Sequence, residues 1–176
     1  MKTTSASKER LKHLTLSATL TAIVTVATII VQIPSPMNGY VNLGDCFVLL
    51  SAWMLGPVYG SVAAALGSAL ADLITGYAIY APGTFVIKGL MALAAWSVLK
   101  LFVSRRAEAS RISYRIVSAL TAEIIMTVGY FLYSAIIFGE GLAAALSIPA
   151  NLMQGLIGCV SSVTLAVILR KTGIMK

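Results

Sequence analysis

Long apolar runs, divided by short polar breaks, make up most of this chain. An α-helix rises about 1.5 Å per residue, so about 20 apolar residues cross the roughly 30 Å hydrocarbon core of a bilayer. Membrane-spanning strands alternate apolar and polar residues instead. The continuous runs predict an all-α membrane protein, one integral domain over residues 1–176, with six transmembrane helices at about 14–33, 46–56, 58–75, 82–103, 113–138 and 147–169.

The second and third of these spans lie in one long apolar stretch that Gly56-Pro57 interrupts. We interpret it as a short helix, a tight turn and a third helix. The alternative is a single kinked helix, which would give an odd number of crossings. An odd number would place the basic N-terminus and the basic central loop at 104–112 on opposite sides of the membrane.

Composition and charge support a membrane location. Hydrophobic residues make up 59% of the chain and charged residues 11%, whereas soluble domains are about 25% charged. The net charge of +7 comes from cations near both termini and in the central loop. Cytoplasmic loops of membrane proteins carry such an excess of Lys and Arg. The N- and C-termini are therefore predicted to be cytoplasmic, and binding of nucleic acid is not the expected reason for the charge.

Several polar side chains fall inside predicted spans, where a charged group is costly and therefore suggests a function. The charged ones are Asp45, Asp72, Lys88 and Glu123, and two amides, Asn151 and Gln154, lie near the start of the last span. Most lie in the half of the protein expected to face outside, close to loop tyrosines. Together they predict a pocket for a small, polar molecule that contains a ring.

Each of these residues also has a structural interpretation. Asp45 is suited to cap its helix, and Lys88 could pair with Asp72, with Glu123 or with neither. The tyrosines are also typical of the membrane interface. With His13 as the single histidine and two isolated cysteines, we expect no metal site, no cofactor and no catalytic residue set.

Small residues recur at intervals of four on two predicted helices. Ala18 and Ala22 lie on the first helix, and Gly60, Ala64 and Ser68 lie on the third. Such stripes let helices approach closely. They serve either packing within the chain or docking of another membrane subunit.

Six segments, in this order and with this spacing, resemble a known family. They are Tyr40-Val-Asn-Leu-Gly-Asp45, Leu55-Gly-Pro-Val-Tyr-Gly60, Gly67-Ser-Ala-Leu-Ala-Asp72, Gly76-Tyr-Ala-Ile-Tyr-Ala-Pro82, Phe85-Val-Ile-Lys-Gly89 and Ile148-Pro-Ala-Asn-Leu-Met-Gln-Gly155. The chain resembles the substrate-binding S components of energy-coupling factor (ECF) transporters, the vitamin importers of bacteria and archaea.

This resemblance implies a six-helix bundle in the cell membrane that binds one micronutrient from outside. It also implies a transmembrane T component, contacted by an alanine motif that Ala18 and Ala22 fit, and two cytoplasmic ATPases. The chain itself has no phosphate-binding loop of the Gly-x-x-x-x-Gly-Lys type. It is therefore expected to be a transport subunit and not an enzyme.

The segments at 80–82 and 85–89 look most like the branch for pyridoxine or hydroxymethylpyrimidine. The implied ligand is a nitrogen heterocycle of the vitamin B6 or thiamine-precursor type, with a queuosine precursor as the competing possibility. We expect Glu123, Asn151 and Gln154 to hydrogen-bond the heterocycle, and the segment 34–45 to act as a lid. Lys88 would contact a substrate oxygen or hold an acidic neighbour. The other predicted binding residues are Tyr40, Asn42, Asp72, Tyr77, Tyr80 and Tyr130.

Three rival functions remain open at this point. A stand-alone secondary transporter would use Asp72, Lys88 and Glu123 as an ion or proton relay. A membrane enzyme would use Glu123 as a base, although no nucleophile accompanies it. An assembly subunit without a ligand would need the small-residue stripes and not the pocket.

Overall fold

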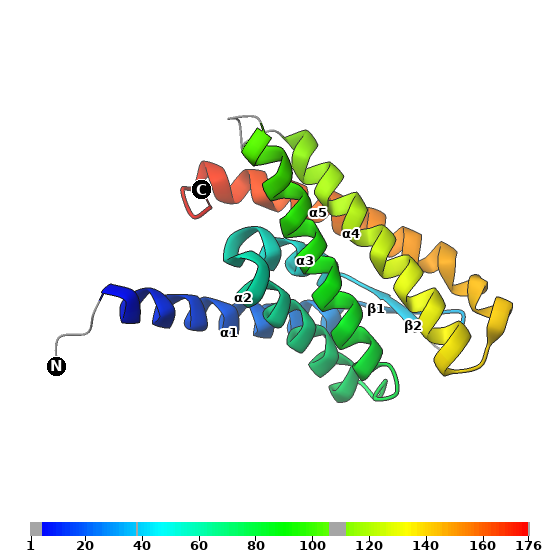
Figure 1. Ribbon diagram of the computed structural model, residues 1–176. Coiled ribbons are helices and arrows are strands. Elements are labelled where there is room, and N and C mark those ends of the chain that lie inside the picture. The colour runs from blue at the N-terminus through cyan, green and yellow to red at the C-terminus, as the bar shows by residue number, and fades with distance from the viewer. Residues whose placement is uncertain (1–4, 38, 106–111, 176) are drawn as a thin grey trace.

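The computed structural model describes residues 5–37, 39–105 and 112–175, and it is helical apart from one short hairpin (Figure 1). The elements in chain order are α1 (Ser5–Ile30), β1 (Gln32–Ser35), β2 (Gly39–Asn42), α2 (Gly44–Ile74), α3 (Ala81–Arg105), α4 (Ile112–Leu132), a π-helical turn (Tyr133–Ile137), a 3₁₀ segment (Gly141–Ser147) and α5 (Ile148–Lys171). Most of the basic central loop expected at 104–112 lies outside the described residues.

Five helical segments are long and apolar enough to cross a membrane: Ser7–Ile30, Gly44–Ile74, Ala81–Phe102, Ile112–Ile137 and Gly141–Lys171. The predicted apolar spans therefore correspond to helices. The number of crossings and the cytoplasmic location of the termini stay predictions.

The hairpin between α1 and α2 corrects the expectation of a purely helical chain. The first span was expected to continue to residue 33, but α1 ends at Ile30 and β1 pairs antiparallel with β2, with Gln32 opposite Asn42. Pro34 and Pro36 cannot donate a helical hydrogen bond, and each favours an extended residue before it. A single pair of short strands gives too little alternation to be recognised beside 20-residue apolar runs.

Helix α2 breaks where the sequence predicts it. Gly56 has a φ of 81° and a ψ of −168°, and Pro57 follows. The chain then folds back on itself, since a Cβ built on Gly60 would lie only 2.5 Å from the carbonyl oxygen of Ser51. We call residues 44–55 the first arm of α2 and residues 57–74 the second arm. The break at Gly56 is confirmed, whereas separate membrane crossings by the two arms stay a prediction.

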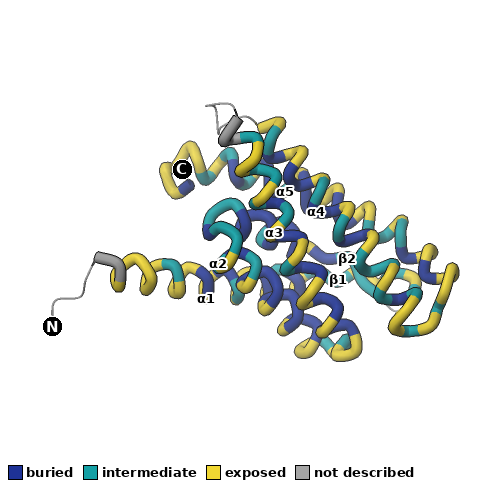
Figure 2. Tube along the Cα trace, in the orientation of Figure 1, coloured by how far each residue is buried: buried dark blue, intermediate teal, exposed yellow. Residues whose placement is uncertain are grey.

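The core lies where α2 packs between α1 and α3, with α4 joining α3 to α5. Val24, Val48, Leu49, Met91 and Met126 are fully buried there. Figure 2 shows buried residues on the inner faces of the helices and exposed ones on the outer faces. Many of the exposed residues are Leu, Ile and Val, which suits contact with lipid.

Candidate functional site

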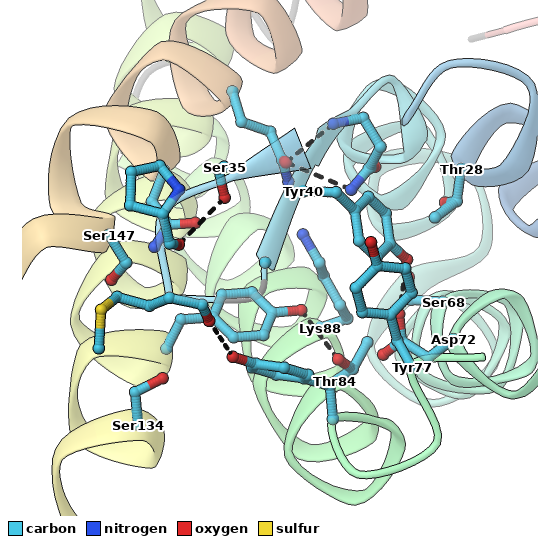
Figure 3. A pocket seen from close by; sticks show the side chains of 18 residues that line it. Thr28, Ser35, Tyr40, Ser68, Asp72, Tyr77, Thr84, Lys88, Ser134 and Ser147 are labelled. Carbon is cyan, nitrogen blue, oxygen red and sulfur yellow. Dashed lines mark hydrogen bonds between the residues drawn. The ribbon is translucent and has the colours of Figure 1, made fainter. Parts of the chain in front are cut away.

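A pocket lies beneath the hairpin, where the ends of α1, α2 and α4 meet the starts of α3 and α5 (Figure 3). The loop between α2 and α3 supplies Tyr77 and Tyr80 to it. Its free volume is about 50 Å³, far below the roughly 300–1,000 Å³ of typical ligand pockets. The hairpin therefore covers a partly closed space in this structure.

The structure brings most of the predicted binding residues to the walls of this one pocket. They come from the hairpin, the loop and four helices, and they are Tyr40, Asn42, Asp72, Tyr77, Tyr80, Lys88, Tyr130, Asn151 and Gln154. Their positions are now established, and their roles in binding a ligand stay predictions.

Glu123 is the predicted binding residue that does not line the pocket. It lies about two turns along α4 from Tyr130, buried against α5. A Cβ on Gly155 would lie 2.9 Å from the Cβ of Glu123, and one on Gly158 would lie 2.7 Å from its Oε1. The two glycines thus make room for this side chain. Neither of its carboxylate oxygens has a hydrogen-bond partner among the described residues.

A network of buried polar groups adjoins the pocket, in which Asn42, Lys88 and Gln154 line the pocket and Asp45 is fully buried beside them. Lys88 forms a salt bridge with Asp45, and Gln154 Nε2 donates to the other Asp45 oxygen at 2.6 Å. The Oε1 atom of Gln154 accepts from the backbone N–H of Asn42 at 3.0 Å and from its side-chain amide at 3.2 Å. These bonds tie β2, α2, α3 and α5 together, and we call Asn42, Asp45, Lys88 and Gln154 the network wall.

This network identifies the partner of Lys88, which the sequence left open, and corrects the interpretation of Asp45 as a helix cap. The partner of Lys88 is Asp45, not Asp72 or Glu123. Asp45 is not the cap of α2, because Leu43 occupies that position and Asp45 lies in the first turn with its side chain fully buried. The sequence does not reveal that the first arm of α2 lies beside α3, so it could not show this pairing.

Four tyrosines, Tyr40, Tyr77, Tyr80 and Tyr130, also line the pocket. The Tyr40 hydroxyl donates to Asp72 Oδ1 at 2.5 Å, and the Tyr40 and Tyr77 rings lie 4.7 Å apart. Tyr80 donates to the Met37 carbonyl oxygen at 2.6 Å. Burial, together with the nearby Asp72 carboxylate, raises the pKa of Tyr40 well above its ordinary value. Its hydroxyl therefore keeps its proton and remains a donor.

Beside these tyrosines, three buried oxygen atoms have no hydrogen-bond partner among the described residues: Thr28 Oγ1, Ser68 Oγ and Asp72 Oδ2. All three residues line the pocket, and Figure 3 shows them on the same side of it. We call Thr28, Ser68 and Asp72 the open wall. The sequence analysis did not assign Thr28 or Ser68 to the site. The four-residue spacing from Ser68 to Asp72 could have revealed Ser68, since it places both on one helix face.

The predicted docking residues lie elsewhere, on a shallow apolar groove between α1 and the second arm of α2. Ala18 and Ala22 are exposed on α1 and line this groove with Val62, Leu66 and Leu70. In contrast, Gly67 on α2 is buried against Thr21 and Val24 of α1. Gly60 and Ala64 of the predicted stripe are also buried within the chain, and Ser68 lines the pocket, whereas the alanines of α1 leave a surface open.

The described residues contain no group of three His, Cys, Asp or Glu side chains that could hold a metal ion. The arrangement consists of hydrogen-bonding groups and aromatic faces around a pocket. Such an arrangement is suited to binding a small molecule.

Comparisons with known proteins agree with this geometry. The chain is 34% identical over 149 residues to a protein of Pyrococcus woesei described as "Uncharacterized protein in gap 3'region", covering 84% of this chain and 95% of that protein. A solved structure described as "Structure and mechanism of the S component of a bacterial ECF transporter" has a TM-score of 0.74, with 24% identity over 93% of this chain and 98% of that one. This likeness supports the fold.

The model of one family covers nearly the whole chain, at residues 8–171, and its description is "ECF-type riboflavin transporter, S component". This family consists of substrate-binding subunits of transporters and not of enzymes, and its members are integral membrane proteins. The five helices of this chain that are long and apolar enough to cross a membrane agree with that location. By its sequence over this range and by its fold, the chain belongs to the S components of ECF transporters.

Proposed function

We propose that this S component captures a small nitrogen heterocycle of the vitamin B6 or thiamine-precursor pyrimidine type from outside the cell. Import would then be driven by a T component and two cytoplasmic ATPases. The observation that carries the proposal is the pocket itself, in which Tyr40, Tyr77, Tyr80 and Tyr130 surround amide and charged groups. Flat heterocycles offer faces for aromatic contact and ring atoms that donate or accept hydrogen bonds.

The β1–β2 hairpin would act as the lid of this pocket. Its residues contribute to the pocket wall, and the free volume of about 50 Å³ is too small for a vitamin. Entry of a ligand therefore requires the hairpin or its neighbours to move. Three hydrogen bonds attach the hairpin to the helices around the pocket. Two join Asn42 to Gln154, and one joins Tyr40 to Asp72. Binding and closure would be coupled through these contacts.

Riboflavin is the second candidate, and the description of the matching family favours it. Its three fused rings are also flat and rich in nitrogen and oxygen acceptors. It needs more space than a single pyridine or pyrimidine ring, so the hairpin would have to move further. A queuosine precursor is a third heterocycle with the same general chemistry.

Ligand-induced thermal stabilisation of the purified full chain in detergent tests these candidates. The panel is pyridoxine, pyridoxamine, hydroxymethylpyrimidine, riboflavin and a queuosine precursor. A ligand at 100 times its Kd stabilises the folded state by about 2.7 kcal/mol, so the true ligand should raise the Tm by several degrees. Stabilisation by a B6-type or pyrimidine compound supports the proposal.

Stabilisation by riboflavin alone would replace the proposed ligand with the second candidate. No stabilisation by any compound, combined with ion-driven uptake by the chain alone in vesicles, would contradict the proposal and favour a stand-alone transporter.

The groove with Ala18 and Ala22 would receive the T component. A Leu side chain at either position would fill the shallow groove and separate the two surfaces. We expect Ala18→Leu and Ala22→Leu to reduce co-purification of the T component and ATPases while ligand binding is retained. The matched control is Ala143→Leu, which adds the same side chain at an exposed position outside the groove. Undiminished co-purification of both groove variants would contradict this docking site.

A further inference from the structure

The open wall of the pocket consists of one carboxylate oxygen and two hydroxyls, which can all accept hydrogen bonds and which pair with none of the described residues. Thr28, Ser68 and Asp72 are each only 2–3% exposed. Their oxygens Thr28 Oγ1, Ser68 Oγ and Asp72 Oδ2 have no hydrogen-bond partner. A buried polar group without a partner costs roughly 1–3 kcal/mol, and a charged one costs more. Three such atoms on one side of a ligand pocket indicate that the ligand supplies their hydrogen-bond partner.

The two charged groups that line the pocket differ in how they are paired. Among the described residues that line it, Lys88 and Asp72 are the charged ones. The charge of Lys88 is already matched by Asp45 in the network wall. Asp72 accepts the hydroxyl of Tyr40 through its Oδ1 atom, and its Oδ2 atom has no hydrogen-bond partner among the described residues. Glu123, packed against Gly155 and Gly158 of α5, is a second buried acidic group. No salt bridge joins Asp72 to a described Lys or Arg side chain, so its second oxygen can accept a bond from a positively charged group.

Aromatic rings border the same carboxylate. Tyr40 bonds Asp72 directly and its ring lies 4.7 Å from that of Tyr77. Both rings belong to the pocket lining. The face of an aromatic ring attracts cations. The Asp72 carboxylate, the hydroxyls of Thr28 and Ser68 and the tyrosine ring faces thus all favour a ligand with a positively charged nitrogen.

We propose that the open wall binds a cationic, N–H-donating nitrogen of the substrate, with Asp72 Oδ2 as the main acceptor and Ser68 and Thr28 as supporting ones. The transporter then selects amines and protonated ring nitrogens over neutral and anionic heterocycles. A charge-assisted hydrogen bond to Asp72 is stronger than one between neutral groups. This inference rests on the proposed function of the pocket and assigns the charge class of its ligand.

Three compounds with one pyridine ring test the inference. Pyridoxamine, pyridoxine and 4-pyridoxic acid differ at a single ring position, which carries an ammonium, an alcohol or a carboxylate. Calorimetric titration of the full chain in detergent should show pyridoxamine binding at least tenfold more tightly than pyridoxine, with 4-pyridoxic acid the weakest. Asp72→Asn should reduce the preference for pyridoxamine over pyridoxine to less than about threefold.

Two further variants separate recognition from folding. Ser68→Ala removes one supporting acceptor and should weaken pyridoxamine binding several-fold with little effect on pyridoxine. Glu140→Gln makes the matched carboxylate-to-amide change outside the pocket and should leave the preference unchanged. Equal affinity for pyridoxamine and pyridoxine, or a preference for the acid, would overturn the inference while the binding function stands.

Tight binding of riboflavin with no binding of the pyridine series would overturn it in the same way, since riboflavin carries no ammonium group. Failure of the wild type to bind any compound of this series or of the earlier panel would overturn the proposed function together with the open-wall assignment.

Discussion

At the pocket, Lys88 and Gln154 both bond to the buried Asp45, whereas the oxygens Thr28 Oγ1, Ser68 Oγ and Asp72 Oδ2 have no hydrogen-bond partner among the described residues. Both sets are buried in the same helical bundle. The network wall links four elements by a salt bridge and hydrogen bonds. The open wall includes a carboxylate whose second oxygen has no partner among the described residues.

The difference separates residues that stabilise the fold from residues whose hydrogen-bonding groups are available to a ligand. Removing a partner from the network wall leaves a buried charge or amide behind, and the folded state loses stability. Removing an acceptor from the open wall leaves no other buried group unpaired. The substitution should therefore weaken ligand binding and have little effect on the stability of the folded state. Substitutions in the network wall should therefore lower the stability of the folded state more than substitutions in the open wall.

The largest effect is expected from Lys88→Met. It keeps the length of the side chain but leaves the fully buried Asp45 without its cation. Breaking a buried ion pair in this way costs about 3–5 kcal/mol, and thermal unfolding in detergent should show a large fall in Tm. The control is Lys100→Met, whose exposed ammonium lies 4.6 Å from the Trp96 ring centre and should contribute under about 1 kcal/mol. Similar Tm values for the two variants would contradict the structural role of the network wall.

Gln154→Leu should have the next largest effect. The amide accepts two bonds from Asn42 and donates one to Asp45. Its loss leaves those groups buried and unpaired, at a cost of about 1–3 kcal/mol. Limited proteolysis should also cut the hairpin faster, because Asn42 loses its anchor. Asn151→Leu, on the same helix and the same pocket, serves as control, because its side chain has no hydrogen bond among the described residues.

A pair of identical substitutions compares a satisfied hydroxyl with an unsatisfied one. Ser118 donates to the Ala95 carbonyl at 2.7 Å and accepts from Trp53 at 3.0 Å, whereas Ser68 Oγ has no partner. Both residues are buried on helices. We expect Ser118→Ala to cost about 1–2 kcal/mol and Ser68→Ala to cost less than about 0.5 kcal/mol. A loss at Ser68 as large as that at Ser118 would mean that Ser68 has a structural partner in the protein.

The smallest effect is expected in how far the protein loses thermal stability at alkaline pH. The pKa of Tyr40 is raised in the folded state, so the folded protein holds this proton more tightly than the unfolded chain does. That contribution is complete below the unfolded pKa of about 10 and declines as the pH rises above it. Tyr40→Phe should therefore flatten the fall in Tm between about pH 9 and 11.

The control for this measurement is Tyr114→Phe, which removes a tyrosine hydroxyl outside the pocket. An unchanged pH profile in Tyr40→Phe would show that the hydroxyl of Tyr40 is not held by Asp72.

Much of the fold was predictable because it follows from local patterns. Apolar runs of about 20 residues correspond to helices, and Gly56-Pro57 corresponds to the break in α2. The hairpin was missed, since four-residue strands have too little periodicity to stand out. The polar residues of the spans were identified as a set because each is costly in lipid, whatever its partner.

The partners of those residues were not predictable. Lys88 lies 43 positions from Asp45, and Gln154 lies 109 positions from it. No sequence spacing links residues that far apart. Glu123 shows the same limit: it shares a helix face with Tyr130, yet one lies against Gly155 and the other at the pocket.

The amino-acid sequence by itself determined that this chain is helical, apolar on its outer surface and provided with a small set of costly polar groups, because hydrophobicity and the Gly and Pro breaks act over short stretches of chain. Only the tertiary structure decided how those groups divide into a satisfied wall and an open one. Hydrogen bonds and ion pairs depend on distances of about 3 Å between helices, and these are set by packing and not by position along the chain.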